Sequence, residues 1–336
     1  MSLSEEKIKS IAVIGSGSWA TALIKILLNK DIQINWWIRN ENTISYINEF
    51  KHNPNYLSNV ELELERIALF SDIQKALLNS SHVLLTVPAA FLPDALKNIS
   101  PANMEEKVVF SAIKGMVPGV NQIIGEYLNE QFSIPLQNIG VITGPCHAEE
   151  VALEKLSYLT VASQDISKAK AMAGCLQCRY INVAVSDDIY GTEYAAVLKN
   201  IIAIASGICH GLGYGDNFQA VLISNAIQEI ERFVKAVHPI SRDIKDSAYL
   251  GDLLVTAYSQ FSRNRTFGNM IGKGYSVKSA QLEMNMIAEG YYAVKSVFEV
   301  NRKYKADIPI INAVYNILYG KISPHIEMRL LSNKLS

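Results

Sequence analysis

The sequence has 336 residues, of which 49% are hydrophobic and 19% charged, and its formal net charge is −1. This composition is typical of a globular protein with sizeable cores and excludes a disordered chain. One hydrophobic core rarely serves more than about 250–300 residues, so two domains are expected. Because the net charge gives no overall basic field, we expect no nucleic-acid partner.

The start of the chain and its cysteines indicate a cytoplasmic protein. Residues 1–7 are polar and acidic and lack the basic-then-apolar order of a secretory signal. No uninterrupted apolar stretch reaches the roughly 18 residues of a membrane span. Four cysteines without a signal indicate reduced thiols, and Cys175-x-x-Cys178 lacks the second pair or histidines of a zinc site, so no metal is expected.

Short apolar runs alternate with helical patterns such as Thr21–Asn29 and Ala89–Lys97 through the first half of the chain. This alternation predicts βαβ units, and the continuous apolarity of the runs indicates a largely parallel sheet covered on both faces. The expected strands are Ile11–Ile14, Gln33–Ile38, Ile67–Phe70, Val83–Val87, Lys107–Ala112, Ile139–Thr143, Tyr158–Ala162 and Tyr180–Val185.

The pattern changes after about Asp187, where strands give way to helices. We therefore predict an α/β Rossmann-type dinucleotide-binding domain with a mostly parallel sheet over residues 1–187, followed by an all-α substrate domain over residues 188–336. The expected helices of the second domain are Ile189–Leu212, Phe218–Val237, Tyr249–Tyr258, a segment near Met270 and Glu289–Tyr304.

A glycine-rich turn follows the first expected strand. Gly15 permits a sharp turn, Gly17 lets the backbone come close to a pyrophosphate, and Ala20 is small enough for the helix to pack on the strand. The free N–H groups and the dipole of the following helix would hold the pyrophosphate. A bare G-x-G-x-x-A pattern is weak, but here it lies between an apolar strand and a helix, as a nucleotide site requires.

Arg39 stands at the end of the second strand, where an NAD-selective site usually has an acidic residue for the ribose 2′-hydroxyl. An arginine there can pair with a 2′-phosphate or stack on adenine. The cofactor is therefore NAD or NADP, with NADP plausible from Arg39. An arginine that only faces solvent at the start of a loop, with no cofactor role, would give the same sequence pattern.

Lys199 is the only formal charge between Tyr194 and Gly215, in a segment apolar enough to be buried. Burial disfavours the ammonium form, so the lysine is either paired or has a lowered pKa. Such a lysine can act as general base or acid near neutral pH, and Asn200 could orient it or the substrate. A lysine that reaches the surface from the edge of the helix is the alternative.

Asp252 is also a lone charge in an apolar run. It could hold Lys199 in place or accept a hydrogen bond from a substrate hydroxyl, although a purely structural ion pair would have the same sequence. The segment Ser262-Arg263-Asn264-Arg265 brings two guanidinium groups, a hydroxyl and an amide together, and arginine binds phosphate oxygens in bidentate fashion. A charged solvent-facing surface is the alternative there.

In chain order these segments resemble the NAD(P)-dependent glycerol-3-phosphate dehydrogenase family of the cytoplasm, over roughly residues 10–300. Each motif is modest alone, whereas the ordered set is highly specific. The motifs are Gly15-Ser-Gly-Ser-Trp-Ala-Thr-Ala22, Ile113-Lys114-Gly115, Gly144-Pro-Cys-His-Ala-Glu-Glu-Val151, Leu198-Lys199-Asn200-Ile201, Gly211-Leu-Gly-Tyr-Gly-Asp-Asn217, Gly251-Asp252-Leu253 and Ser262-Arg-Asn-Arg-Thr-Phe-Gly268.

The resemblance implies a role for each of these residues. Lys199 would accept the proton of the substrate hydroxyl, Lys114 would hold substrate and contact the cofactor, and Arg263 would bridge the substrate phosphate and the cofactor. The cofactor site would also be lined by Gly15, Gly17, Ser18, Trp19, Arg39, Ala148, Ile287 and Glu289. The substrate pocket would be completed by Gly144, Cys146, Asp252, Ser262 and Asn264.

The implied activity is the interconversion of sn-glycerol 3-phosphate and dihydroxyacetone phosphate, which would supply glycerol 3-phosphate for phospholipid synthesis. The resemblance also implies that the protein is a homodimer. The chain departs from the family at Ala20, where glycine is usual, and at Cys146-His147, where Ser-Phe is usual. A thiol donates a hydrogen bond less well than a hydroxyl, which puts the substrate contact at Cys146 in question.

Two other functions remain open. A dehydrogenase of small 3-hydroxy acids would also use a lysine on an apolar helix, but the arginines near Ser262 favour a phosphate over a carboxylate. A non-catalytic nucleotide sensor would have no need to keep Lys114, Lys199, Asp252 and Arg263 together.

Overall fold

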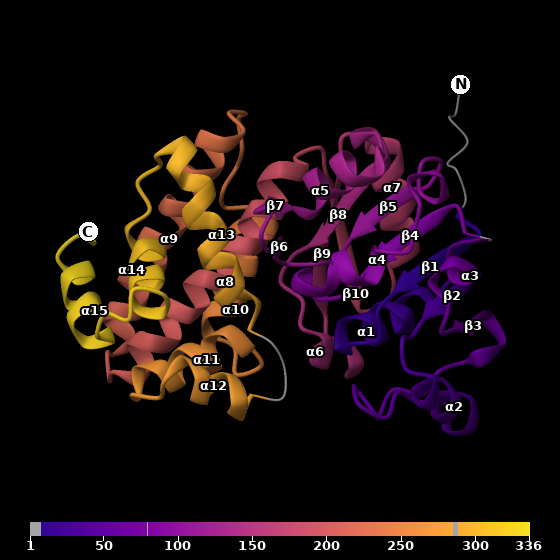
Figure 1. Ribbon diagram of the computed structural model, residues 1–336, viewed down its shortest axis with the longest axis horizontal. Helices are drawn as coiled ribbons and strands as arrows, with labels where there is room; N and C mark the ends of the chain where they lie inside the picture. The colour runs from indigo at the N-terminus through magenta and orange to yellow at the C-terminus, as the bar shows by residue number, and fades with distance from the viewer. Residues whose placement is uncertain (1–7, 79, 285–287) are drawn as a thin grey trace. The chain divides into compact units, whose positions relative to one another are not determined.

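The computed structural model describes residues 8–78, 80–284 and 288–336, and the chain divides into two compact units (Figure 1). The α/β unit comprises the described residues up to Val87, together with Phe91–Ile113 and Ile124–Ile189. The helical unit comprises Tyr190–Ser336 and two short segments from earlier in the chain, Pro88–Ala90 and Lys114–Ile123. Sequence patterns did not predict that these two segments belong to the helical unit.

An eight-stranded sheet forms the centre of the α/β unit, in the order β10-β9-β8-β5-β4-β1-β2-β3. Neighbouring strands pair in parallel except β8 and β9, which pair antiparallel. The predicted mostly parallel sheet is therefore confirmed. The strands are β1 (Ser10–Ile14), β2 (Gln33–Trp37), β3 (Ile67–Phe70), β4 (His82–Leu85), β5 (Val108–Ser111), β8 (Ile139–Thr143), β9 (Ser157–Ser163) and β10 (Ile181–Ser186).

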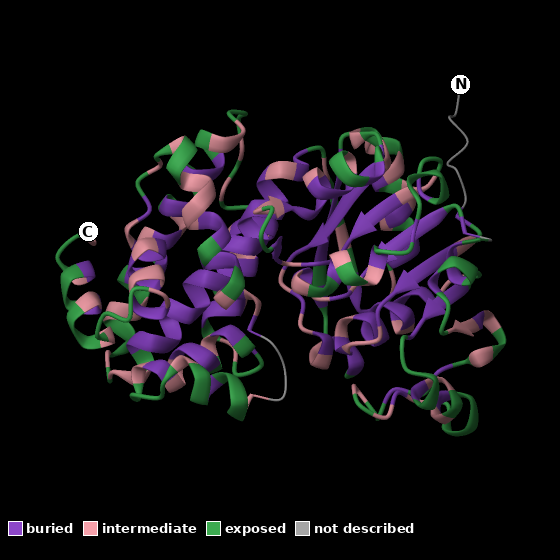
Figure 2. Ribbon diagram, in the orientation of Figure 1, coloured by how far each residue is buried: buried purple, intermediate pink, exposed green. Residues whose placement is uncertain are grey.

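The central strands are buried because their residues are apolar on both faces (Figure 2). Helix α7 packs on β9 and β10, α3 packs on β1, β2 and β3, and α5 packs on β8. Asn40 and Asp165 cap α2 and α7, their side chains accepting from backbone N–H groups of the first turn. The helices are α1 (Ser18–Leu27), α2 (Glu41–Phe50), α3 (Ile73–Leu78), α4 (Leu92–Leu96), α5 (Ile124–Phe132), α6 (Ala148–Ala152) and α7 (Ile166–Leu176).

The chain reverses its direction across the sheet beside β1. It runs from β1 to β2 and β3 on one side, then returns to place β4 on the other side of β1. In open α/β sheets, ligands bind at the carboxyl ends of the strands where the strand order reverses. The glycine turn after β1 lies at this switch point.

The helical unit is built around α8 (Ile189–Gly211), which the helices in Figure 1 surround. By length and composition alone α8 could cross a membrane, but 89% of its most apolar window is buried, as in the core helix of a globular protein. A short hairpin of β6 (Met116–Val117) and β7 (Gln122–Ile123) belongs to this unit and was not predicted. The other helices are α9 (Asp216–Val237), α10 (Asp252–Tyr258), α11 (Arg263–Gly272), α12 (Val277–Glu283), α13 (Glu289–Tyr304), α14 (Pro309–Leu318) and α15 (Pro324–Ser332).

Glycines let α11 lie directly against the backbone of α8. A Cβ atom on Gly268 would lie 2.1 Å from the carbonyl oxygen of Ile204, and one on Gly272 would lie 2.3 Å from that of Ile208. From the other helix, a Cβ on Gly207 would lie 2.0 Å from the carbonyl oxygen of Arg265. No side chain fits at these positions, so the glycines fix the distance between α8, which carries Lys199, and α11.

Candidate active site

The glycine turn has the backbone shape that the sequence predicted. Gly15 has φ +123°, and a Cβ there would lie 2.6 Å from Oγ1 of Thr86, so any side chain would be strained and would clash. A Cβ on Gly17 would meet no described atom within 4 Å. Packing within the protein therefore explains the glycine at 15 but not the one at 17, which fits close approach of a ligand to the backbone.

The other expected cofactor residues of the α/β unit follow the carboxyl ends of β1, β2 and β8. Ser18 is buried and Trp19 half-buried at the start of α1, while Ala148 is buried as the first residue of α6. Arg39 is exposed and lies two residues after the end of β2.

Gly144 and Cys146, the expected substrate residues of the same unit, lie between β8 and α6. Gly144 has φ +114°, and a Cβ on it would lie 2.8 Å from the carbonyl oxygen of Tyr158. Cys146 is buried, with 7% of its surface exposed. Between them and Ala148, His147 occupies the N-cap position of α6.

The charged centre of the helical unit consists of Lys199, Asp252 and Lys114. Lys199 is 3% exposed and Asp252 1% exposed, and their side chains form an ion pair. The ammonium of Lys114 lies 3.7 Å from the other carboxylate oxygen of Asp252. Lys199 therefore does not reach the surface from the edge of its helix, which excludes that alternative. The carboxylate of Asp252 interacts with both lysines.

Burial and the neighbouring charges set the pKa of Lys199. Desolvation lowers this pKa from its usual 10.5 to about 7; Asp252 opposes the shift and the positive charge of Lys114 adds to it. A lysine with a pKa near 7 exchanges its proton readily at neutral pH, as a general acid or base requires.

Asn200 holds the backbone of Lys114 rather than Lys199. Its amide donates a hydrogen bond of 2.8 Å to the carbonyl oxygen of Lys114. Lys114 lies three positions after β5 but belongs to the helical unit. There the hydrogen bond from Asn200 holds its backbone carbonyl, and the carboxylate of Asp252 holds its ammonium. Sequence reasoning proposed Asn200 as a partner of Lys199 or the substrate and did not anticipate this contact.

The first turn of α11 contains the expected phosphate-binding residues. Ser262 is the N-cap, and its side chain accepts a hydrogen bond of 3.3 Å from the N–H of Arg265. Arg263 is exposed and Arg265 half-buried, so the two guanidinium groups have different surroundings. Asn264 is buried and accepts a hydrogen bond of 2.9 Å from the N–H of Gly290, which joins α11 to the start of α13.

Glu289, an expected cofactor residue, is half-buried, and its Oε2 atom is buried. Burial raises the pKa of its carboxyl, while Arg263, the N–H of Ala89 and Lys114 act in the opposite direction. A Cβ on Gly115 would lie 2.5 Å from Oε2 of Glu289, so the glycine is needed for this close approach. Ile287, which the resemblance also assigns to the cofactor site, lies outside the described residues.

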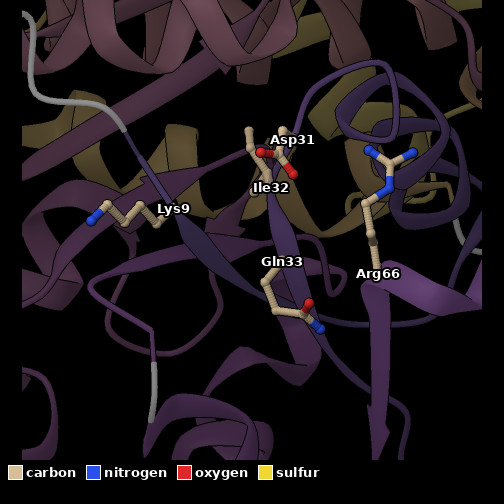
Figure 3. A pocket seen from close by; sticks show the side chains of 5 residues that line it. All are labelled: Lys9, Asp31, Ile32, Gln33 and Arg66. Atoms are coloured by element: carbon tan, nitrogen blue, oxygen red, sulfur yellow. The ribbon is translucent and has the colours of Figure 1, made fainter.

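Two other features lie apart from these groups. The pocket in Figure 3 lies where β1 and β2 begin, at the opposite edge of the sheet from the glycine turn, and Lys9 points away from Arg66 there. Arg66 donates hydrogen bonds to carbonyl oxygens after α1, including that of Leu28 at 2.8 Å.

Burial raises the pKa of Cys175 to about 11, which keeps it a thiol at neutral pH and disfavours a metal or redox role.

Family models match nearly all of this arrangement. The N-terminal model of NAD-dependent glycerol-3-phosphate dehydrogenase matches residues 10–169, and the C-terminal model matches residues 188–329. The chain belongs to the NAD-dependent glycerol-3-phosphate dehydrogenase family.

Relatives and solved structures agree with this assignment. The chain is 33% identical to the glycerol-3-phosphate dehydrogenase [NAD(P)+] of Staphylococcus carnosus (strain TM300), over 96% of this chain and 98% of that protein. It is 34% identical to that of Staphylococcus aureus (strain JH9), over 93% and 94%. The crystal structure of the Coxiella burnetii glycerol-3-phosphate dehydrogenase superposes with a TM-score of 0.89 at 28% identity, covering 97% and 98%. These matches confirm the family that the motifs predicted.

Proposed function

We propose that the chain interconverts sn-glycerol 3-phosphate and dihydroxyacetone phosphate with NAD or NADP as the second substrate. The observation that carries this proposal is the buried Lys199 paired with Asp252, in a chain whose two halves match this family. A lysine is costly to bury, and here it shares the carboxylate of Asp252 with Lys114. Proton transfer to or from a substrate oxygen explains why the arrangement is kept.

The residues after β1 fit a dinucleotide. Gly17 has open space beyond its Cα atom, and the first N–H groups of α1, a helix of ten residues, are of the kind that binds a pyrophosphate. NAD(P)+ supplies a hydride acceptor when bound. Arg39 would lie near the adenosine ribose, where its charge favours a 2′-phosphate, and this makes NADP use plausible.

In glycerol 3-phosphate oxidation, neutral Lys199 takes the proton of the C2 hydroxyl while the C2 hydrogen leaves as hydride, and the C2–O bond becomes a carbonyl. Asp252 keeps the lysine side chain oriented and balances the charge that it gains. In the reverse direction, the ammonium of Lys199 donates the proton to the developing alkoxide. Lys114, held by Asn200 and Asp252, adds a second positive charge beside the substrate oxygens.

The first turn of α11 is the proposed phosphate site. Arg263 is exposed and free to reach a phosphate, while Ser262 and Asn264 are buried beside it. Gly144 and Cys146 would line the rest of the substrate pocket, with the Cys146 thiol in place of the family's usual hydroxyl. Glu289 would help to line the cofactor site, where its carboxyl interacts with the N–H of Ala89 and lies close to Gly115.

The proposal includes a cytoplasmic location, a homodimer and a role in supplying glycerol 3-phosphate for phospholipid synthesis. The location is supported by four free cysteines, three of them buried. The homodimer and the metabolic role rest on the family alone. The two domains of the proposal divide the chain near residue 187, with a dinucleotide domain before this point and a substrate domain after it.

A spectrophotometric assay tests the proposal. Reduction of dihydroxyacetone phosphate is followed in parallel with NADH and NADPH, and the oxo forms of small 3-hydroxy acids are assayed under the same conditions. We expect turnover of the phosphorylated ketone with at least one cofactor. Faster turnover of the oxo acids would favour the 3-hydroxy-acid dehydrogenase, and cofactor binding without any turnover would favour the sensor.

A further inference from the structure

Three consecutive carbonyl groups of the glycine turn each accept a hydrogen bond from a side chain. The indole N–H of Trp36 donates to the oxygen of Gly15 at 2.7 Å. The amide of Asn53 donates to the oxygen of Ser16 at 3.0 Å. The hydroxyl of Thr21 donates to the oxygen of Gly17 at 3.2 Å, which also accepts from the backbone N–H of Thr21.

These hydrogen bonds fix the direction of the N–H groups of the turn. A trans peptide is planar, with its carbonyl oxygen and its N–H on opposite sides. Holding the carbonyls of Gly15, Ser16 and Gly17 against the protein therefore turns the N–H groups of the next three residues the other way. Successive N–H groups that point in one direction, at the start of a helix, form an anion-binding site.

Asn53 is the member of this set that comes from farthest along the chain. It follows α2, has no exposed surface, and donates both to the Ser16 oxygen and to the Thr21 hydroxyl at 3.0 Å. Its own side-chain oxygen accepts from the N–H of Asn55 at 3.0 Å, which fixes which end of the amide faces the turn. No aliphatic or carboxylate side chain could supply these two donors.

We propose that Asn53 and Trp36 are positioning residues for the cofactor pyrophosphate, because they hold the carbonyls of the glycine turn away from it and keep the N–H groups pointing toward it. Neither residue needs to contact the ligand. The inference rests on dinucleotide binding at this turn, which is part of the proposed function, but it is independent of the substrate and of Lys199.

The test measures cofactor binding directly. Asn53→Ala and Trp36→Phe are compared with the wild type by titrating NADH and NADPH and following nucleotide fluorescence without substrate. We expect Kd to rise about tenfold in each variant, the size typical for the loss of one buried hydrogen bond. At saturating cofactor, kcat and the KM for dihydroxyacetone phosphate should stay within about twofold of the wild type, because these residues act on the cofactor alone.

Asn35→Ala is the matched control. Asn35 is another buried asparagine of the same unit, and its amide donates to the Ser80 hydroxyl at 2.8 Å, not to the turn. It should lower the melting temperature without changing the Kd of the cofactor. Equal weakening of cofactor binding in Asn35→Ala and Asn53→Ala would overturn the proposal, because the effect would then reflect stability alone.

Trp36→Phe keeps the inference testable if Asn53→Ala does not fold, since it removes one donor and keeps an aromatic ring. Unchanged Kd in the folded variants would overturn the positioning role while leaving the proposed activity intact. A wild-type protein that binds neither dinucleotide would overturn the inference together with the cofactor assignment, and the wild-type titration by itself would show this.

Discussion

Gly268→Ala tests whether the direct contact between α8 and α11 sets the geometry of the site. The new Cβ would lie 2.1 Å from the backbone carbonyl oxygen of Ile204, whereas real Cβ contacts below 3.0 Å essentially never occur. The obstacle is backbone, so a side-chain rotation cannot relieve it. The first turn of α11 must therefore move away from α8 by about 1 Å, the scale of misplacement that costs about 100-fold in rate.

Gly268→Ala also costs stability. Overpacking of a close-packed core costs about 1–3 kcal/mol, from which the better helix propensity of alanine recovers about 1 kcal/mol. Gly174→Ala in α7 is the matched control, because a Cβ on Gly174 would meet no described atom within 4 Å and the residue is exposed. This control should gain about 0.5–1 kcal/mol and keep full activity.

The assay compares kcat/KM for dihydroxyacetone phosphate with kcat/KM for unphosphorylated dihydroxyacetone, alongside denaturant unfolding of each variant. Moving Arg263 and Asn264 relative to Lys199 should lower the first value by about 10–100-fold and change the second less, because unphosphorylated dihydroxyacetone lacks the phosphate that the first turn of α11 is proposed to bind. A general loss of folded enzyme would lower both values by the same factor. Equal losses on both substrates would refute the reasoning, and so would a variant as active as Gly174→Ala.

Three further predictions follow from the buried charges. Lys199→Ala should lower kcat by at least about 100-fold and leave the NADH Kd within about twofold, and surviving turnover would show that another group carries the proton. Glycerol 3-phosphate oxidation should rise with pH through about 7, where burial places the pKa of Lys199, and ketone reduction should fall over the same range; a pH profile flat between 6 and 8 would contradict this. Burial raises the pKa of Glu229 from 4.5 to about 8, although it accepts hydrogen bonds from the N–H groups of Ile310 and Ile311. A raised carboxyl pKa stabilises the fold at low pH and loses this contribution as pH rises from about 4.5 to 8, so urea unfolding should show the wild type losing stability relative to Glu229→Gln by up to about 1.4 kcal/mol per pH unit there, and a pH-independent difference would contradict it.

Local sequence patterns predicted the elements that depend on neighbouring residues. Continuous apolar runs marked the strands of the sheet, because a strand covered on both faces needs apolar residues at every position. The turn after β1 was recognisable because glycine at 15 is demanded by its backbone angle, as the φ of +123° shows. The burial of Lys199 followed from the apolar helix around it, since a helix apolar on most faces has no side left for solvent.

Patterns of this kind do not report which distant segments meet. Asn53 gave no signal, because an asparagine in a loop resembles any turn residue until its amide is found on the Ser16 carbonyl. Asn200 was predicted to orient Lys199 or the substrate, and no local pattern indicated that its amide donates to the carbonyl oxygen of Lys114. Glu229 is an acidic residue on a helix, and only the position of α14 shows that it caps another helix.

The sequence by itself indicated the sheet, the glycine turn and an apolar surrounding for Lys199, because each follows from side chains that are close together along the chain. The tertiary structure decided that one carboxylate, Asp252, serves both Lys199 and Lys114, and that Lys114 groups with the helices rather than with the strand before it. The physical reason is that a hydrogen bond or an ion pair depends on distances of a few ångströms between residues far apart in sequence. Those distances exist only after the helices have packed.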